Sequence, residues 1–163
     1  VDGRSMSHDQ AECQKMVSYW NIKGTDQHLC KVGCFMSHLT ILQDIVQRDL
    51  SNVLIVEDDA LQVNELPSIG DLPRDSITYF GGYIANKKIT NREKFAIDHK
   101  EGLNILDDKY RMLTTLSYFV PNAQIAKDIV NKLKLLKRWR AIDISLPEVL
   151  DKKYYWYPAR FIV

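Results

Sequence analysis

The sequence predicts an α/β domain, because a helical pattern, a turn and a buried strand follow one another in the first third of the chain. From Val32 to Arg48 apolar residues recur at steps of three and four, as in a helix with one buried face. Ser51-Asn52 ends this pattern, and Val53 to Val56 is an unbroken apolar run. A run without alternation suits a strand covered on both faces, such as a central strand of a parallel sheet. The helical positions are Val32, Phe35, Met36, Leu39, Leu42, Ile45 and Val46.

Two further strands are predicted on either side of a long loop. Ile77 to Phe80 has the composition of a strand and ends at Gly81-Gly82. The polar segment 83–109 shows little periodicity, so we expect a long loop with only fragments of regular structure. The run from Leu113 to Val120 favours a strand.

The last third of the chain predicts two helices and two extended segments. Pro121-Asn122 is expected to open a helix, and Ser145 has a glutamate three residues later, which is the spacing of a capping box. Pro147 would then lie in the first turn of that second helix. Tyr154 to Tyr157 and Phe161 to Val163 are expected to be extended. The apolar face of the first helix consists of Ile125, Ile129, Val130, Leu133 and Leu136.

Length, charge and cysteine content restrict the class of protein. The 163 residues fit one domain covering positions 1–163. The 22 lysines and arginines nearly balance the 21 aspartates and glutamates, so no net positive field attracts the chain to nucleic acid. No apolar run approaches the roughly 18 residues of a membrane span. Three cysteines are too few for a disulfide framework and indicate a reducing compartment, so we expect a cytoplasmic protein.

The acidic triplet Glu57-Asp58-Asp59 directly follows the predicted strand Val53 to Val56. Three neighbouring carboxylates repel one another unless a cation or solvent separates them. Ligands of open α/β sheets bind at the carboxyl ends of strands, and a hard cation such as Mn²⁺ or Mg²⁺ can bridge carboxylates to a diphosphate. In an extended segment, Glu57 and Asp59 would point to the same side. The alternative is a strand end whose acidic residues simply face water.

Two motifs lie in a fixed order around this triplet. Gly33-Cys34-Phe35-Met36-Ser37-His38-Leu39 precedes Val53-Leu54-Ile55-Val56-Glu57-Asp58-Asp59-Ala60. Together they resemble glycosyltransferase family 25, which includes lipooligosaccharide galactosyltransferases and collagen galactosyltransferases. Weaker similarities follow the family's order along nearly the whole chain. They are Val1-Asp2-Gly3, Tyr79-Phe80-Gly81-Gly82, Ser117-Tyr118-Phe119-Val120, Ile142-Asp143 and Tyr157-Pro158.

The resemblance implies a GT-A-like fold for nucleotide-diphospho-sugars, with a mixed, mostly parallel sheet flanked by helices. Members of the family begin with a strand upstream of their Val-Asp-Gly segment, whereas this chain opens on Val1-Asp2-Gly3. We therefore expect the first strand to be missing, either because the chain is trimmed or because it is naturally short.

The resemblance also assigns roles in donor and metal binding. It implies that Asp59, together with Glu57, binds Mn²⁺ or Mg²⁺, and that Glu57 or Asp58 orients the donor, a UDP-sugar. Gly33, Ser37 and His38 are expected near the donor, since a helix amino end with a glycine suits a diphosphate. The alternative for these three residues is structural, with Gly33 packing and the two polar side chains joining helix to sheet.

An inverting transfer needs a base that takes the proton of the acceptor hydroxyl. Asp143 is the candidate, because Ile142 and Ile144 flank it and apolar neighbours raise the pKa of a carboxylate. Its alternative role is to cap the helix near Ser145. Asp58 is the substitute for Asp143 as catalytic base.

These residues together predict a metal-dependent inverting glycosyltransferase. It would move galactose or glucose from a nucleotide sugar to a saccharide, a lipooligosaccharide or a hydroxylysine-type acceptor, as in lipopolysaccharide biosynthesis. The alternative is a truncated, non-catalytic domain of the same fold that binds a sugar or a partner.

Three other features have weaker functional interpretations. The basic segment Lys132 to Arg140 complements a helix dipole, or else contacts an anionic membrane peripherally, as a lipid-linked acceptor would require. Cys30, Cys34 and His38 share one helical face, but without a fourth ligand they indicate a partly buried thiol rather than a zinc site. The aromatic residues from Tyr154 to Tyr157 suit either a core strand or a surface on which a sugar ring stacks.

Overall fold

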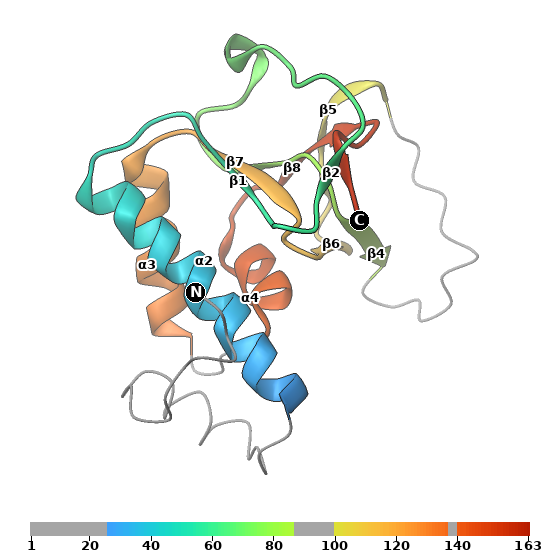
Figure 1. The fold of residues 1–163 in the computed structure, drawn as a ribbon. Coiled ribbons are helices and arrows are strands. Elements are labelled where there is room, and N and C mark those ends of the chain that lie inside the picture. Colours follow the sequence, from blue (N-terminus) through green and yellow to red (C-terminus); the bar gives the residue numbers. More distant parts are fainter. Residues whose placement is uncertain (1–25, 87–99, 137–139) are drawn as a thin grey trace.

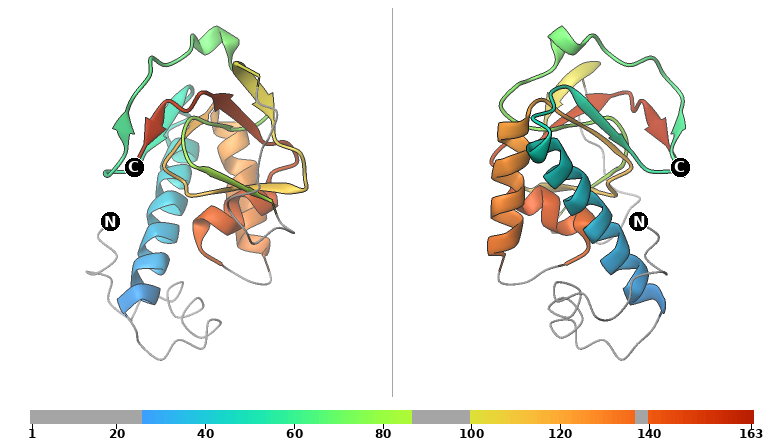
Figure 2. Two further views of the ribbon diagram at one scale, coloured as in Figure 1. Left: turned by 90° about the vertical axis from the view of Figure 1, so that its right-hand side faces the viewer. Right: turned by 60° about the vertical axis from the view of Figure 1, so that its left-hand side comes forward.

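A computed structural model describes residues 26–86, 100–136 and 140–163, and these residues form an α/β fold. The helices pack together on one side of a five-stranded sheet (Figures 1 and 2). The helices of the described residues are α2 (Asp26–Gln47), α3 (Ala123–Leu135) and α4 (Ile142–Val149). The strands are β1 (Val53–Val56), β2 (Leu61–Gln62), β3 (Thr78–Tyr79), β4 (Tyr83–Asn86), β5 (Gly102–Ile105), β6 (Tyr110–Leu113), β7 (Ser117–Val120), β8 (Tyr154–Tyr157) and β9 (Phe161–Ile162).

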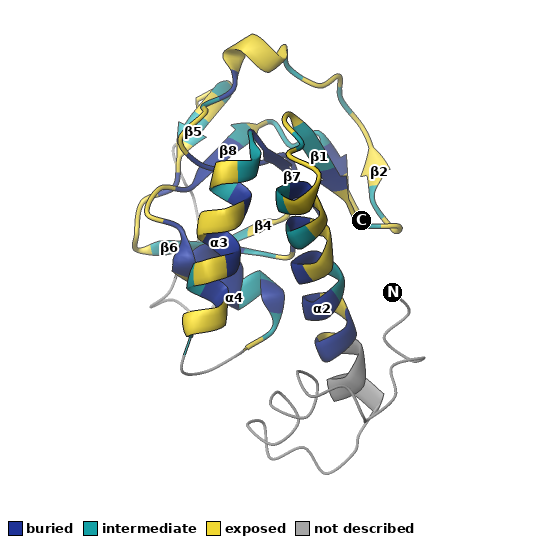
Figure 3. Cartoon of the chain, turned by 90° about the vertical axis from the view of Figure 1, so that its left-hand side faces the viewer, coloured by how far each residue is buried: buried dark blue, intermediate teal, exposed yellow. Residues whose placement is uncertain are grey.

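Helix α2 confirms the predicted helix and its apolar face. Its predicted apolar positions from Val32 to Ile45 are all buried, and Val46 packs at their edge. Figure 3 shows the dark blue buried face of α2 turned toward α3 and the sheet. Asp44 and Arg48 form an ion pair of 3.2 Å one helical turn apart. The helix begins at Asp26, however, so the motif from Gly33 to Leu39 lies inside it and not at its amino end.

The sheet is mixed, as predicted, but the prediction that it is mostly parallel was wrong. Its strand order is β1-β7-β3-β8-β5, and only β3 and β8 pair in parallel among the strands of the described residues. Among the described strands, β1 is the first in this order and pairs antiparallel with β7, so it is neither central nor parallel to its neighbour there. Ile55 is buried but Val56 is 41% exposed. An apolar run favours a strand, but it determines neither the burial of each residue nor the direction of a strand that pairs with it from far along the chain.

The direction of each strand determines which ends share an edge of the sheet. Because β1 and β3 both run antiparallel to β7, and β8 runs parallel to β3, the strands β1, β3 and β8 point the same way. Their carboxyl ends lie at one edge, which we call the rim. The rim contains the acidic triplet after β1, Gly81-Gly82 after β3 and the end of β8.

The segment between Tyr83 and Val120 is more regular than the sequence predicted. The expected loop contains the strands β4 and β5, and residues 87–99 lie outside the described residues. The single strand expected from Leu113 to Val120 is instead two strands, β6 and β7, separated at Thr114. Thr114 has a φ angle of 71°, so the chain turns there and cannot continue one strand.

Helix α4 begins earlier than the predicted capping box at Ser145. It starts at Ile142, and Ser145 is a buried residue inside the helix. The Ser145 hydroxyl accepts a hydrogen bond from the Arg140 backbone N–H at 3.1 Å and donates to the Arg140 carbonyl at 3.2 Å. Glu148 pairs with the Arg140 guanidinium at 3.0 Å instead of reaching back to a cap. Ser145 and Glu148 have the spacing of a capping box, but both side chains contact Arg140, which precedes the helix.

We expect the replacement Asn122→Ala to lower the free energy of unfolding by about 1 kcal/mol. Asn122 is the N-cap of α3, and its side-chain oxygen accepts a hydrogen bond from the Ile125 N–H at 3.0 Å. Urea denaturation followed by circular dichroism measures the change. Lys127→Ala, at an exposed position of the same helix, is the control and should have little effect. Equal stability of the two variants would contradict the capping role.

Candidate functional site

The acidic triplet forms a turn at the rim, so the expectation of an extended segment was wrong. The backbone N–H of Ala60 donates to the Glu57 carbonyl at 3.2 Å, and Asp58 and Asp59 lie in the turn. Asp58 and Asp59 are exposed, whereas Glu57 is half-buried and directed toward α2. The turn therefore separates one inward carboxylate from two outward ones.

The Glu57 carboxylate is held by hydrogen bonds from two other elements. Its Oε1 atom lies 3.1 Å from Nε2 of His38 on α2 and 2.5 Å from the hydroxyl of Thr115, which precedes β7. The hydrogen bond from His38 and that from Thr115 keep the pKa of Glu57 below its ordinary value, although partial burial opposes them. Glu57 is therefore a fixed anion that points away from bulk solvent.

His38 is a buried link between helix and sheet, which is the structural alternative that its motif left open. It is 4% exposed, and its Nδ1 lies 2.8 Å from the Tyr118 hydroxyl on β7. The two rings are stacked with centroids 5.6 Å apart. Burial raises the pKa of Tyr118 well above its ordinary value, so the phenol keeps its proton and can donate it to Nδ1. The neutral tautomer with hydrogen on Nε2 then satisfies both contacts.

Asp143 approaches this network from α4, a helix that lies far from the triplet in sequence. Its charge is among the causes that raise the pKa of Cys34 and of Tyr79, after burial in each case. The Oδ1 atom of Asp143 is buried and has no hydrogen-bond partner within the described ranges. Asp143 lies in the first turn of α4, but no side chain caps that helix. The fold thus brings the candidate base near Cys34, whose Sγ atom lies 4.0 Å from the Glu57 carboxylate.

The thiol of Cys34 lies beside the same carboxylates. Its Sγ atom is 4.0 Å from Oε1 of Glu57. Burial and the nearby charges of Glu57, Asp143 and Asp59 raise the pKa of the Cys34 thiol to about 11, although the residue as a whole is exposed. Of the other predicted donor residues, Gly33 is buried and Ser37 half-buried within α2. Because these positions lie in the middle of a helix, the argument from a helix amino end does not apply to them.

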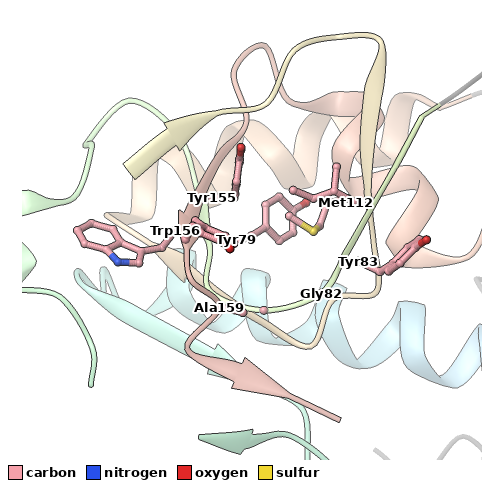
Figure 4. A pocket seen from close by; sticks show the side chains of 10 residues that line it. Tyr79, Gly82, Tyr83, Met112, Tyr155, Trp156 and Ala159 are labelled. Atoms are coloured by element: carbon pink, nitrogen blue, oxygen red, sulfur yellow. The ribbon is translucent and has the colours of Figure 1, made fainter. Parts of the chain in front are cut away.

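A cavity of about 350 Å³ opens at the ends of β3 and β8 on the same rim (Figure 4). In Figure 4 the Tyr79 ring points toward Met112, whereas the Trp156 indole points to the opposite side, away from both. The Arg160 guanidinium instead lies over the Trp156 indole, with its Cζ atom 5.7 Å from the ring centroid. Residues Tyr79, Gly81, Gly82, Tyr83, Ile84, Met112, Tyr155, Trp156, Tyr157 and Ala159 line the cavity. In the sheet, β8 is three strand spacings from β1, or about 14 Å, so one extended ligand can contact the ends of both strands.

The glycines after β3 are required by the backbone around this cavity. A Cβ atom on Gly81 would lie 2.6 Å from the Phe161 carbonyl oxygen. Gly82 has a φ angle of 119°, and a Cβ there would lie 3.0 Å from Met112 Sδ. The sequence identified Gly81-Gly82 as a strand end and as part of a segment that resembles the family, but it gave no signal for Met112, which joins the cavity through the pairing of β4 with β6.

The oxygen donors of the rim fit a hard divalent cation such as Mn²⁺ or Mg²⁺ at Asp59 better than at Glu57. Asp58 and Asp59 present exposed carboxylates, which are the ligands that such ions prefer. Oε1 of Glu57 already accepts two hydrogen bonds. The one group of metal-binding side chains within the described segments consists of Cys34, His38 and Glu57 and does not include Asp59. The joint role of Glu57 and Asp59 as metal ligands remains a prediction.

The basic segment that ends α3 is partly neutralised. Lys132 pairs with Asp151 at 2.7 Å, and Arg140 pairs with Glu148 at 3.0 Å. Lys134 is exposed and Leu135 is 80% exposed, while residues 137–139 lie outside the described part. None of the helices among the described residues has the length and hydrophobicity needed to span a bilayer. Peripheral membrane contact at this segment remains a prediction.

Comparison with known proteins gives a consistent family assignment. The family profile described as glycosyltransferase family 25 (LPS biosynthesis protein) matches residues 1–146. The human protein named "Inactive glycosyltransferase 25 family member 3" is 25% identical over 138 residues, and its mouse counterpart is 28% identical over 138 residues. In both cases the match covers 77% of this chain and 22% of the relative, so the chain spans about a fifth of the length of these proteins. No solved structure matches the chain.

We expect Thr115→Val to destabilise the protein by about 1–3 kcal/mol at neutral pH, because it removes a hydrogen bond to a charged carboxylate. The folded pKa of Glu57 lies below its ordinary value of 4.5, so this stabilisation is complete above that pH and is lost as the pH falls through the folded pKa. The difference between variant and wild type should therefore shrink in acid. Urea denaturation at several pH values measures it.

Thr78→Val provides a matched control for this experiment. Thr78 is fully buried, and its hydroxyl has no hydrogen-bond partner among the residues that the structure describes. Its replacement should be neutral or stabilising at every pH. If the two variants change the free energy of unfolding by the same amount at every pH, the hydrogen bond between Thr115 and Glu57 contributes nothing to stability.

Proposed function

This chain belongs to glycosyltransferase family 25, and from that premise we propose that it transfers a hexose, galactose or glucose, from a UDP-sugar to an acceptor hydroxyl in a metal-dependent, inverting reaction. The acceptor is a saccharide, a lipid-linked sugar or a hydroxylysine-type protein group. The single observation that carries this proposal is that Asp143 of α4, with a buried Oδ1 that has no hydrogen-bond partner among the described residues, lies near enough to Cys34 for its charge to act on the thiol, which is itself 4.0 Å from the Glu57 carboxylate.

Donor binding in this proposal uses Asp58 and Asp59, the two exposed residues of the triplet. Asp59 holds the divalent cation with the donor diphosphate, and Asp58 lies beside it for the ribose or sugar. Such an ion supplies positive charge where the leaving diphosphate becomes more negative. Glu57 has a supporting part, since His38 and Thr115 fix its carboxylate and with it the start of the turn.

Asp143 acts as the base in this proposal. A base needs a free lone pair within reach of the acceptor hydroxyl, and its Oδ1 is buried with no hydrogen-bond partner in the described segments. Cys34 and Tyr79, whose pKa values its charge raises, connect it to the triplet on one side and to the cavity on the other. In this proposal the acceptor sugar stacks in the aromatic cavity and its hydroxyl reaches Asp143 past Tyr79, because Tyr79 lines the cavity and Asp143 does not.

A second candidate is a non-catalytic domain that binds a nucleotide sugar or a partner. It is favoured by the names of the human and mouse relatives, which describe those proteins as inactive. The engagement of Glu57 by His38 and Thr115 also suits a structural role for that carboxylate. Donor binding without turnover distinguishes this candidate from an active enzyme.

We expect UDP with Mn²⁺ to raise the melting temperature, and Asp59→Ala to abolish the rise. At a ligand concentration one hundred times the Kd, the gain in stability is about 2.7 kcal/mol. Differential scanning fluorimetry measures the shift, with Mn²⁺ alone as the baseline. Glu65→Ala, which removes an exposed carboxylate six positions further along, is the control and should keep the rise. An unshifted wild type would exclude donor binding by this chain.

We expect Asp143→Asn to lower turnover by about 10²–10⁴-fold while the donor-induced melting shift is retained. Turnover is measured as UDP release from UDP-galactose and UDP-glucose with a panel of saccharide acceptors. Glu148→Gln, at an exposed position of the same helix, should keep full turnover. If binding and turnover fall together in Asp143→Asn, Asp143 is structural; if the wild type binds donor without turnover, the non-catalytic candidate holds.

A further inference from the structure

Three side chains with metal-binding atoms meet where the middle of α2 packs against the end of β1. Oε1 of Glu57 lies 3.1 Å from Nε2 of His38 and 4.0 Å from Sγ of Cys34. All three ligand atoms lie within 4.8 Å of one another. We propose that Cys34, His38 and Glu57 bind a divalent cation of the zinc class, at a site separate from the hard cation proposed at Asp59.

The observed spacing is close to that of a tetrahedral zinc site. Zinc binds sulfur at about 2.3 Å and nitrogen or oxygen at about 2.0–2.2 Å, so neighbouring ligand atoms are about 3.3–3.6 Å apart. The His38–Glu57 distance of 3.1 Å is slightly shorter than this, and the Cys34–Glu57 distance of 4.0 Å is slightly longer. Cys34 is exposed, so its side chain can rotate to close the remaining gap.

The ligand types select the class of ion. A thiolate, an imidazole and one carboxylate suit zinc or cobalt, whereas Mn²⁺ and Mg²⁺ prefer oxygen ligands alone. Three protein ligands leave the fourth position to water. Because Cys34 is exposed and the Glu57 side chain is 26% exposed, that position can face solvent and an ion can enter.

The electrostatic surroundings favour a cation at this position. The Glu57 carboxylate lies 4.0 Å from the Cys34 sulfur, so a thiolate formed without a metal ion would lie beside a negative charge. A bound cation offsets the repulsion among these groups and stabilises the thiolate. The thiol proton leaves to solvent as the sulfur–metal bond forms.

The Tyr118 hydroxyl lies within hydrogen-bond distance of Nδ1 of His38, the ring nitrogen that would not bind the metal. Metal-binding histidines commonly hydrogen-bond through their other ring nitrogen, and Nδ1 of His38 lies 2.8 Å from the Tyr118 hydroxyl. To bind metal, His38 moves its hydrogen from Nε2 to Nδ1, so that Nε2 offers a lone pair and Nδ1 donates to the Tyr118 oxygen. The imidazole stays neutral, and its hydrogen bond to Glu57 is replaced by the two bonds to the ion.

Titration with Co²⁺ under reducing conditions, without nucleotide, tests the proposal. We expect a thiolate-to-cobalt charge-transfer band in the near ultraviolet, saturating at one ion per chain. Cys34→Ala should remove the band and raise the Kd by more than about tenfold. Alanine suits an exposed helical position, so this variant should fold, which circular dichroism verifies. Cys30→Ala, one turn earlier on α2, is the matched control and should keep the band.

Two further variants distinguish this site from the hard-cation site proposed at Asp59. Glu57→Gln should weaken Co²⁺ binding more than about tenfold, while Asp59→Ala should keep the band even where it loses the shift with UDP and Mn²⁺. The absence of a band in the wild type, or a band that survives Cys34→Ala, would overturn the proposal. Either outcome leaves the proposed function intact, because donor binding is measured separately.

Discussion

The Glu57 carboxylate is the point on which the architecture of the rim depends. Glu57 directly follows strand β1, and its carboxylate accepts hydrogen bonds from His38 in the middle of α2 and from Thr115 before β7. Three elements far apart in sequence are thereby joined through one half-buried anion. Hydrogen bonds to a charged group are among the stronger contacts in a protein interior, and a carboxylate left without them in this position would be costly. The orientation of the exposed pair Asp58 and Asp59 follows, because the turn starts from a fixed residue.

The rim gathers chemically useful groups because of strand direction. Strands β1, β3 and β8 end at the same edge, so the acidic turn, the glycine pair after β3 and the aromatic cavity share one side of the sheet. Asp143 of helix α4, from a different part of the chain, lies near enough to Cys34 for its charge to act on that thiol. This is the arrangement in which open α/β sheets bind their ligands. An extended donor with a sugar at one end matches the separation between the acidic turn and the cavity better than a small compact ligand does.

The two cation sites proposed at this cluster differ in ligand chemistry. Asp58 and Asp59 provide oxygen ligands toward solvent, whereas Cys34 and His38 provide sulfur and nitrogen on the inner side of the turn. Glu57 lies between them and cannot serve both fully, since each of its oxygens has a limited number of acceptor positions. An ion of the zinc class would tie α2 to β1 through the inner side and leave the outer carboxylates to the donor.

The sequence by itself determined the helix α2, the strand β1, the start of a helix at Pro121-Asn122 and the family, since these depend on periodicity and on motifs contiguous in the chain. It also identified His38, the acidic triplet and Asp143 as candidates, although not which of them meet. Only the tertiary structure decided that β1 pairs antiparallel with β7, that the triplet turns Glu57 inward, and that Ser145 lies inside α4. The aromatic cavity and the meeting of Cys34, His38 and Glu57 likewise needed the fold. The physical reason is that local spacing fixes which residues share a face, whereas the direction of pairing and the buried partner of a polar group come from segments dozens of residues away.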